Sequence, residues 1–104
     1  MNRYRWGQEA TLTKSLEITI RHEVGLHARP AAMFVKAANS FISQITVKNL
    51  SNESDSVDAK SILGILSSGV QMNDRILITA EGEDEDEALA ALRDLIEGDF
   101  IQPT

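Results

Sequence analysis

The sequence predicts an α+β fold, a two-layer open-faced sandwich in which three helices cover one face of a four-stranded antiparallel sheet. Apolar and polar residues alternate in four short segments, so each of these strands has one apolar and one polar face. Two longer segments repeat apolar residues at helical spacing, and a third, shorter segment is mostly apolar. The segments follow one another as β-α-β-β-α-β-α. Strands with a single apolar face are typical of an antiparallel sheet that is covered on one side.

The first strand and the first helix flank a short loop. Alternation predicts the strand at residues 16–21, and Gly25 marks residues 23–27 as a loop. The apolar period then predicts a helix at residues 28–39. Pro30 is compatible with this helix because backbone N–H groups in the first turn have no helical partner.

The remaining elements follow from the same two periodicities. Alternation predicts three more strands, at residues 41–48, 56–59 and 75–80. Apolar residues predict a short helix at residues 62–67 and a longer final helix at residues 83–97.

The chain of 104 residues suits a single domain, which we expect at residues 15–104. Residues 1–14 show no steady period and are expected to form a flexible N-terminal extension. A docking role for Trp6 in that extension has no support in the sequence. At the other end, Phe100 and Ile101 follow the last helix and are candidates to pack back on the domain.

The composition argues against several classes of protein. A net charge of −6 argues against a nucleic-acid-binding protein, which usually carries a basic excess. The absence of cysteine rules out disulfides and thiolate metal sites and fits a cytoplasmic protein. No apolar run reaches the roughly 18–20 residues of a membrane span, and the first residues lack the apolar core of a secretion signal. We therefore expect a cytoplasmic, monomeric protein that does not insert into membranes.

The sequence predicts no metal or cofactor site. The acidic residues at positions 83–86 lie in the first turn of the last predicted helix, where the helix dipole favours negative charge. His22 lies five residues before His27, which is not the spacing of paired zinc ligands on one helix. We therefore interpret His22 as a structural residue.

His27 combines the setting of a phosphate site with the chemistry of a nucleophile. It lies at or just before the start of the helix at residues 28–39, where unpaired backbone N–H groups and the positive end of the helix dipole attract anions. Arg29 adds a guanidinium whose fork matches phosphate oxygens. A neutral imidazole nitrogen is available near neutral pH and can attack phosphorus. On these residues alone, a plain helix cap is the alternative interpretation.

Three short stretches share a family resemblance that covers about residues 15–97. They are GLHARPAA at residues 25–32, AKSILGILS at residues 59–67 and AEGEDE at residues 80–85. In this order they resemble the active-site signature, the regulatory segment and the turn before the last helix of the HPr family. Members of that family are the histidine-containing phosphocarriers of the bacterial phosphoenolpyruvate-dependent sugar phosphotransferase system.

The resemblance implies roles for three residues. His27 matches the histidine that is phosphorylated on Nδ1, and Arg29 matches the arginine that helps to hold the phosphoryl group. Ser61 matches the serine that a dedicated kinase phosphorylates in many Gram-positive-type bacteria, although a simple N-cap would need no modification. The implied partners are enzyme I as donor, a sugar-specific enzyme IIA as acceptor, and an HPr kinase/phosphorylase and a transcription regulator at Ser61. Such a carrier turns over no small substrate and is not an enzyme in the strict sense.

The short helix after Ser61 is a candidate partner surface. The side chains that we assign to this surface are Ile62, Leu63, Ile65 and Leu66. They cannot all point inward on so short a helix, so some should be exposed beside His27. Lys60 is assigned to the same surface because its charge can attract acidic partners.

Two other functions remain as alternatives. A regulatory HPr-like protein would act chiefly through Ser61 and a transcription factor, but such paralogues usually lack the active histidine, so His27 argues against it. A ligand-binding or interaction module without covalent chemistry would need all three stretches to match by chance.

Overall fold

The computed structural model describes residues 13–101, which form strands and helices in the predicted order β-α-β-β-α-β-α. The strands are β1 (Thr13–Thr19), β2 (Gln44–Asn49), β3 (Val57–Asp58) and β4 (Arg75–Glu81). The helices are α1 (Ala28–Asn39), α2 (Ile62–Ser67) and α3 (Glu85–Glu97). The predicted bounds of the first two helices are confirmed.

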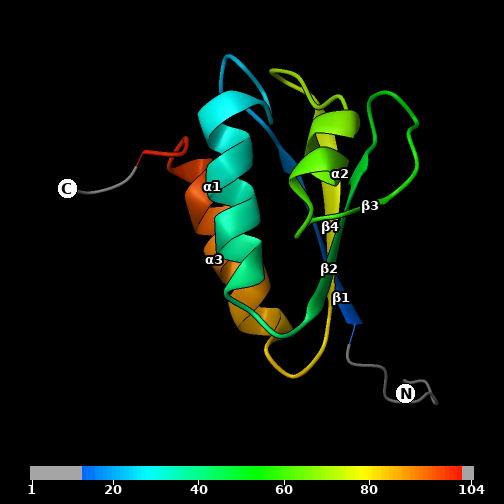
Figure 1. The fold of residues 1–104 in the computed structure, drawn as a ribbon, viewed down its shortest axis with the longest axis vertical. Helices are drawn as coiled ribbons and strands as arrows, with labels where there is room; N and C mark the ends of the chain where they lie inside the picture. The colour runs from blue at the N-terminus through cyan, green and yellow to red at the C-terminus, as the bar shows by residue number, and fades with distance from the viewer. Residues whose placement is uncertain (1–12, 102–104) are drawn as a thin grey trace.

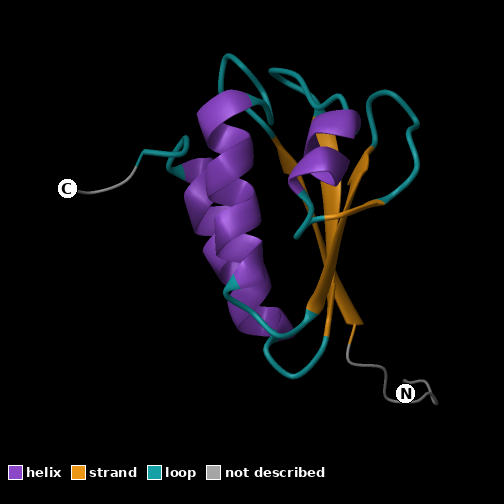
Figure 2. Cartoon of the chain, viewed as in Figure 1, coloured by secondary structure: helices purple, strands orange, loops and turns teal. Residues whose placement is uncertain are grey.

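The strands form one antiparallel sheet in the order β1-β4-β2-β3. Along β4, Ile76, Ile78 and Ala80 are buried, whereas Arg75 and Glu81 are exposed, so only one face of the sheet is covered. Helix α3 packs on β1 and β4, α2 packs on β3, and α1 contacts both other helices. Figures 1 and 2 show the three helices on one side of the sheet. The predicted α+β open-faced sandwich is confirmed.

The core lies between the helices and the sheet. Phe34 of α1, Ile65 of α2 and Leu92 of α3 are fully buried in it. Each such side chain contributes about 1.5–3 kcal/mol through its removal from water. The other face of the sheet is mostly polar, and there Glu17 of β1 forms an ion pair with Arg75 of β4.

Helices α1 and α2 run in opposite directions. Leu26, just before α1, donates its backbone N–H to the carbonyl oxygen of Val70, just after α2, at 3.0 Å. Asn39 at the end of α1 donates its Nδ2 group to the carbonyl oxygen of Lys60, just before α2, at 3.2 Å. The start of α1 and the end of α2 therefore share one end of the molecule, at the top of Figure 1.

The predicted first residues of β2 and of α3 are both wrong, and the segments that precede these two elements contact each other. Strand β2 begins at Gln44, three residues later than predicted, and α3 begins at Glu85, two residues later. The backbone N–H groups of Ile42 and Ser43 donate to the carboxylate of Asp84, each at 2.9 Å. These donors are therefore used by a side chain of the turn and not by a neighbouring strand.

The outer strands also differ from their predicted lengths. Strand β3 has two residues instead of four. Strand β1 ends at Thr19, because Ile20 exchanges backbone hydrogen bonds with Asn73 and Asp74 of the loop before β4. Strand β1 begins at Thr13, within the expected extension, and Trp6 lies outside the described residues.

Beyond α3, Phe100 is only 5% exposed and Ile101 is 76% exposed. The prediction that the tail packs back is therefore confirmed for Phe100 and wrong for Ile101. Within residues 13–101, none of the helices combines the length and the apolar character that crossing a membrane requires.

Candidate functional site

His27 occupies the N-cap position of α1. Its backbone is extended, with φ −130° and ψ 166°, and its side chain makes no capping hydrogen bond. The His27 side chain is half-buried, and the next two residues, Ala28 and Arg29, are exposed. The imidazole is thus held at the protein surface without being used to cap the helix.

The first turn of α1 provides donors for an anion. Within the described residues, no hydrogen-bond partner is found for the backbone N–H groups of Ala28 and Arg29, and Pro30 has no N–H. No acidic residue lies in this first turn to neutralise the positive end of the helix dipole. The guanidinium of Arg29 belongs to the same turn. This end of α1 is therefore suited to bind phosphate oxygens next to the His27 ring.

The chain enters α1 through a strained residue. Ala28 has φ +53°, in the left-handed region that residues with a Cβ rarely adopt. Such a conformation costs about 1–2 kcal/mol, and strain of this kind clusters at functional sites. The strain lies directly after His27, at the first residue of α1.

The loop before His27 is anchored to the loop after α2. Leu26 is fully buried and hydrogen-bonded through its backbone to Val70. Gly25 has φ +65°, and a Cβ at this position would lie 2.2 Å from the carbonyl oxygen of Val70. Only glycine fits so close to a neighbouring backbone in this conformation. The support under His27 is therefore rigid.

His22 lies at the beginning of this loop, in the structural role expected from the sequence. Its Nδ1 atom accepts a hydrogen bond from the backbone N–H of Val24 at 3.2 Å. Its ring meets the ring of Phe100 in a T-shaped arrangement, with 5.9 Å between the ring centroids. Within the described residues, no group of three or more His, Asp or Glu side chains is placed to hold a metal ion.

Ser61 is the N-cap of α2, as predicted. Its Oγ accepts a hydrogen bond from the backbone N–H of Gly64 at 3.0 Å. Because α2 runs opposite to α1, Ser61 lies at the end of α2 that is farther from His27. The helix has six residues and is therefore about 9 Å long. The structure therefore does not bring the two predicted phosphorylation sites together.

The predicted partner surface needs one correction. Ile65 is fully buried in the core, because a helix packed on a sheet must turn one side inward, so it does not belong to a surface. The remaining apolar side chains of α2, Ile62, Leu63 and Leu66, are exposed. Lys60, assigned to the same surface, donates from Nζ to the carbonyl oxygen of Phe41 at 2.7 Å, so its ammonium holds two loops together.

Two exposed apolar residues near His27 were missed from the sequence. Val24 lies in the loop before α1 and Met72 in the loop after α2, and both are exposed. The hydrogen bond between Leu26 and Val70 joins these two loops, which places both residues at the His27 end of the molecule, near Leu66. Each is a single apolar residue in a loop outside any periodic segment, so no periodicity could reveal them.

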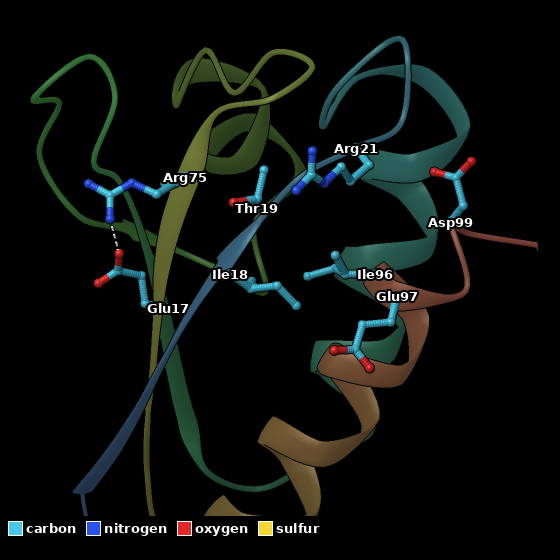
Figure 3. Close-up of a pocket in the computed structure, with 8 residues that line it drawn as sticks. All are labelled: Glu17, Ile18, Thr19, Arg21, Arg75, Ile96, Glu97 and Asp99. Carbon is cyan, nitrogen blue, oxygen red and sulfur yellow. Dashed lines mark hydrogen bonds and ion pairs between the residues drawn. The ribbon is translucent and has the colours of Figure 1, made fainter.

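A cleft of about 470 Å³ lies between β1 and the C-terminal end of α3 (Figure 3). Its lining residues are Glu17, Ile18, Thr19, Arg21, Arg75, Ile96, Glu97 and Asp99. Charged groups of both signs surround the apolar side chains of Ile18 and Ile96, and Glu17 is already paired with Arg75. His27 does not line this cleft, so the cleft is separate from the site at α1.

Comparison with known proteins gives consistent matches. A family model described as "PTS HPr component phosphorylation site" matches residues 14–98. The chain is 38% identical over 84 residues to the phosphocarrier protein HPr of Mycoplasma pneumoniae, covering 81% of this chain and 93% of that protein. It is 47% identical over 74 residues to a multiphosphoryl transfer protein of Haemophilus influenzae, covering 71% of this chain and 15% of that protein. The chain thus spans only a small part of this longer relative.

Solved structures agree with these sequence matches. HPr-C-His from Thermoanaerobacter tengcongensis has a TM-score of 0.80 and 47% identity, covering 88% of this chain and 99% of that one. A phosphocarrier protein HPr from Bacillus anthracis has a TM-score of 0.75 and 38% identity, covering 81% of this chain and 96% of that one. At these identities the likeness extends beyond the general fold.

Proposed function

The chain belongs to the HPr family, the phosphocarriers of the phosphotransferase system, and from this premise we propose that His27 carries the phosphoryl group. The observation that supports the proposal best is the place of His27 at the N-terminus of α1, beside two backbone N–H groups that have no partner among residues 13–101. A phosphoryl group on the ring would lie next to these donors and the positive end of the helix dipole. The same features would stabilise the negative charge that transfer adds.

The proposed transfer is a displacement at phosphorus. The Nδ1 lone pair of His27 attacks the phosphoryl group of phosphorylated enzyme I, and the new N–P bond forms while the bond from phosphorus to its donor atom on enzyme I breaks. Arg29 holds phosphoryl oxygens through its guanidinium. In the second half of the cycle an acceptor atom of a sugar-specific enzyme IIA displaces His27, which returns unmodified. The carrier turns over no small substrate of its own, so it is not an enzyme in the strict sense.

We propose that enzyme I and enzyme IIA both dock on the exposed apolar side chains around His27. Val24, Leu66 and Met72 lie at this end of the molecule. Ile62 and Leu63 continue the surface along α2. Exposed apolar side chains beside a reactive group favour a protein partner over a small substrate. We place this carrier in the cytoplasm, as a monomer.

We also propose Ser61 as a site of regulatory phosphorylation by an HPr kinase/phosphorylase, with a transcription regulator as reader. A phosphate at this N-cap would continue to accept the Gly64 N–H and would add roughly −1.5 to −2 charge. Since Ser61 lies at the far end of α2, the charge would act on the docking surface near Ile62 and Leu63. The His27 ring itself would be little affected.

One experiment tests the carrier proposal. The protein is incubated with phosphoenolpyruvate and enzyme I, and one added phosphate is sought by intact mass. We expect an acid-labile adduct that is absent in His27→Ala. His22 is the only other histidine and serves as internal control, so the adduct must map to His27. An unmodified wild-type protein with active enzyme I, or an adduct on His22, would contradict the proposal.

A parallel reaction tests Ser61 separately. With ATP and an HPr kinase, we expect an acid-stable adduct that Ser61→Ala abolishes. Ser67, on the opposite end of the same helix, provides the control substitution Ser67→Ala. Failure of the kinase to modify the wild-type chain would restrict Ser61 to its role as an N-cap.

A further inference from the structure

The chain reverses sharply after α3. Gly98 ends the helix, and the next two residues, Asp99 and Phe100, have φ +57° and +60°. Two consecutive residues with side chains in the left-handed region are strained. Backbone hydrogen bonds from Asp99 to Ile96 and from Phe100 to Leu95, both 2.9 Å, hold the turn. Such strain persists only where surrounding contacts compensate for it.

The compensating contact is the burial of Phe100 against His22. The Phe100 ring is 5% exposed and lies T-shaped to the imidazole, with an interplanar angle of 83°. This geometry is a favourable one for two aromatic rings. Arg21, which precedes His22, and Asp99, which precedes Phe100, line the same cleft in Figure 3. The tail thus meets the end of β1 where the loop to His27 begins.

His22 in turn shapes that loop. Its Nδ1 accepts the backbone N–H of Val24, and its carbonyl oxygen accepts the N–H of Gly25 at 2.9 Å. The first of these bonds requires the imidazole ring to face Val24 with an unprotonated Nδ1. A ring free to rotate about its side-chain bonds would make this bond only part of the time.

We propose that Phe100 is a positioning residue for phosphoryl transfer at His27. Its ring holds His22 in the orientation that accepts the Val24 N–H, and the loop so ordered presents His27 to its partners. The inference rests on the proposed function of His27. Phe100 lies just beyond residues 14–98, which the family model matches.

The test compares two tail variants in the full chain. Phe100→Ala removes the ring, whereas Ile101→Ala removes an exposed apolar side chain next to it. Three quantities are measured well below the melting temperature. They are the rate of phosphorylation by enzyme I, the hydrogen exchange of the Val24 amide relative to that of Phe34, and the ¹⁵N shifts of the His27 ring.

For Phe100→Ala we expect exchange at Val24 to rise about tenfold, the His27 shifts to move and the rate to fall about tenfold. Ile101→Ala should leave all three unchanged. A folded Phe100→Ala protein with wild-type rate and wild-type exchange at Val24 would overturn the proposal.

Two substitutions of His22 keep the proposal testable if Phe100→Ala does not fold. His22→Phe retains an aromatic contact but has no acceptor, and His22→Asn loses the ring but can offer Oδ1 to the same Val24 amide. We expect slow transfer in His22→Phe and faster transfer in His22→Asn, and equal rates would contradict the inference. If wild-type protein is never phosphorylated, the carrier proposal fails, while Val24 exchange and the His27 shifts still decide whether Phe100 orders the loop.

Discussion

Ser43 donates two hydrogen bonds to a single carboxylate oxygen of Asp84, one from its backbone N–H at 2.9 Å and one from its hydroxyl. The other carboxylate oxygen accepts the backbone N–H of Ile42 at 2.9 Å. Gly82 lies against the same serine, where a Cβ would approach Ser43 Oγ to 2.6 Å. One carboxylate therefore joins the turn before α3 to the segment that leads into β2.

Removal of this carboxylate should destabilise the fold. In Asp84→Ala, three donors lose their acceptor, and we expect the melting temperature to fall by several degrees. The exposed neighbour Glu83 provides the control substitution Glu83→Ala, which should melt like the wild type. Equal melting temperatures for both variants would show that water replaces the carboxylate without loss.

The same carboxylate should make stability depend on acid. The hydroxyl of Ser43, and then the N–H groups of Ile42 and Ser43, lower the pKa of Asp84 below its ordinary value, against an opposing effect of partial burial. Because the pKa is lower in the folded state than in the unfolded state, the stabilisation is complete above the unfolded pKa. It is lost as the pH falls through the lowered folded pKa. Urea unfolding between about pH 6 and pH 2 should therefore show the wild type and Asp84→Ala converging at the acidic end.

Local patterns were sufficient to predict the layers of this fold. In β1, Leu16 and Ile18 alternate with Glu17 and Thr19, and this alternation alone indicates which face of the strand packs against the core. The errors at the start of β2 and α3 have a different cause. The bond between Asp84 and Ser43 joins residues 41 positions apart, so no local pattern reveals that it replaces strand pairing.

The candidate site was predictable to the extent that it is local. His27 and Arg29 share one helical turn, so their common position at the start of α1 follows from the sequence. The distance of Ser61 from His27 depends on the direction of α2, which long-range contacts such as that between Asn39 and Lys60 determine. The inward direction of Ile65 likewise depends on how a short helix lies on the sheet.

Loss of the Arg29 guanidinium should impair transfer without affecting the fold. Arg29 is exposed, so Arg29→Ala should change the free energy of unfolding by less than about 0.5 kcal/mol. A hydrogen bond to a charged group contributes about 1.5–3 kcal/mol, which corresponds to a rate of phosphorylation by enzyme I roughly ten- to a hundredfold lower. Arg93 is an exposed residue of α3, and the control variant Arg93→Ala should be phosphorylated at the wild-type rate. A normal rate in Arg29→Ala would remove Arg29 from the site.

The support under His27 should fail when Gly25 acquires a side chain. In Gly25→Ala, the left-handed conformation costs about 1–2 kcal/mol, and the new Cβ also meets the Val70 carbonyl oxygen at 2.2 Å. We expect a lower melting temperature and slower phosphorylation, because the loop must move away from Val70. Gly69→Ala is a matched control, since Gly69 has φ +66° but meets only the tip of the Asn52 side chain at 3.2 Å. Equal losses of stability and rate in both variants would mean that the left-handed backbone alone requires glycine at position 25, and that the contact with Val70 adds nothing.

Two neighbours on α2 should respond in opposite ways to truncation. Ile65 is fully buried, so Ile65→Ala should lower the free energy of unfolding by about 2–5 kcal/mol. Leu63 is 76% exposed, so Leu63→Ala should change it by less than about 0.5 kcal/mol. If α2 is a docking surface, Leu63→Ala should instead raise the KM for the carrier in the enzyme I reaction, because it removes apolar area that only the complex buries. Urea denaturation and steady-state kinetics separate the two effects, and an unchanged KM would limit the docking surface to the residues around His27.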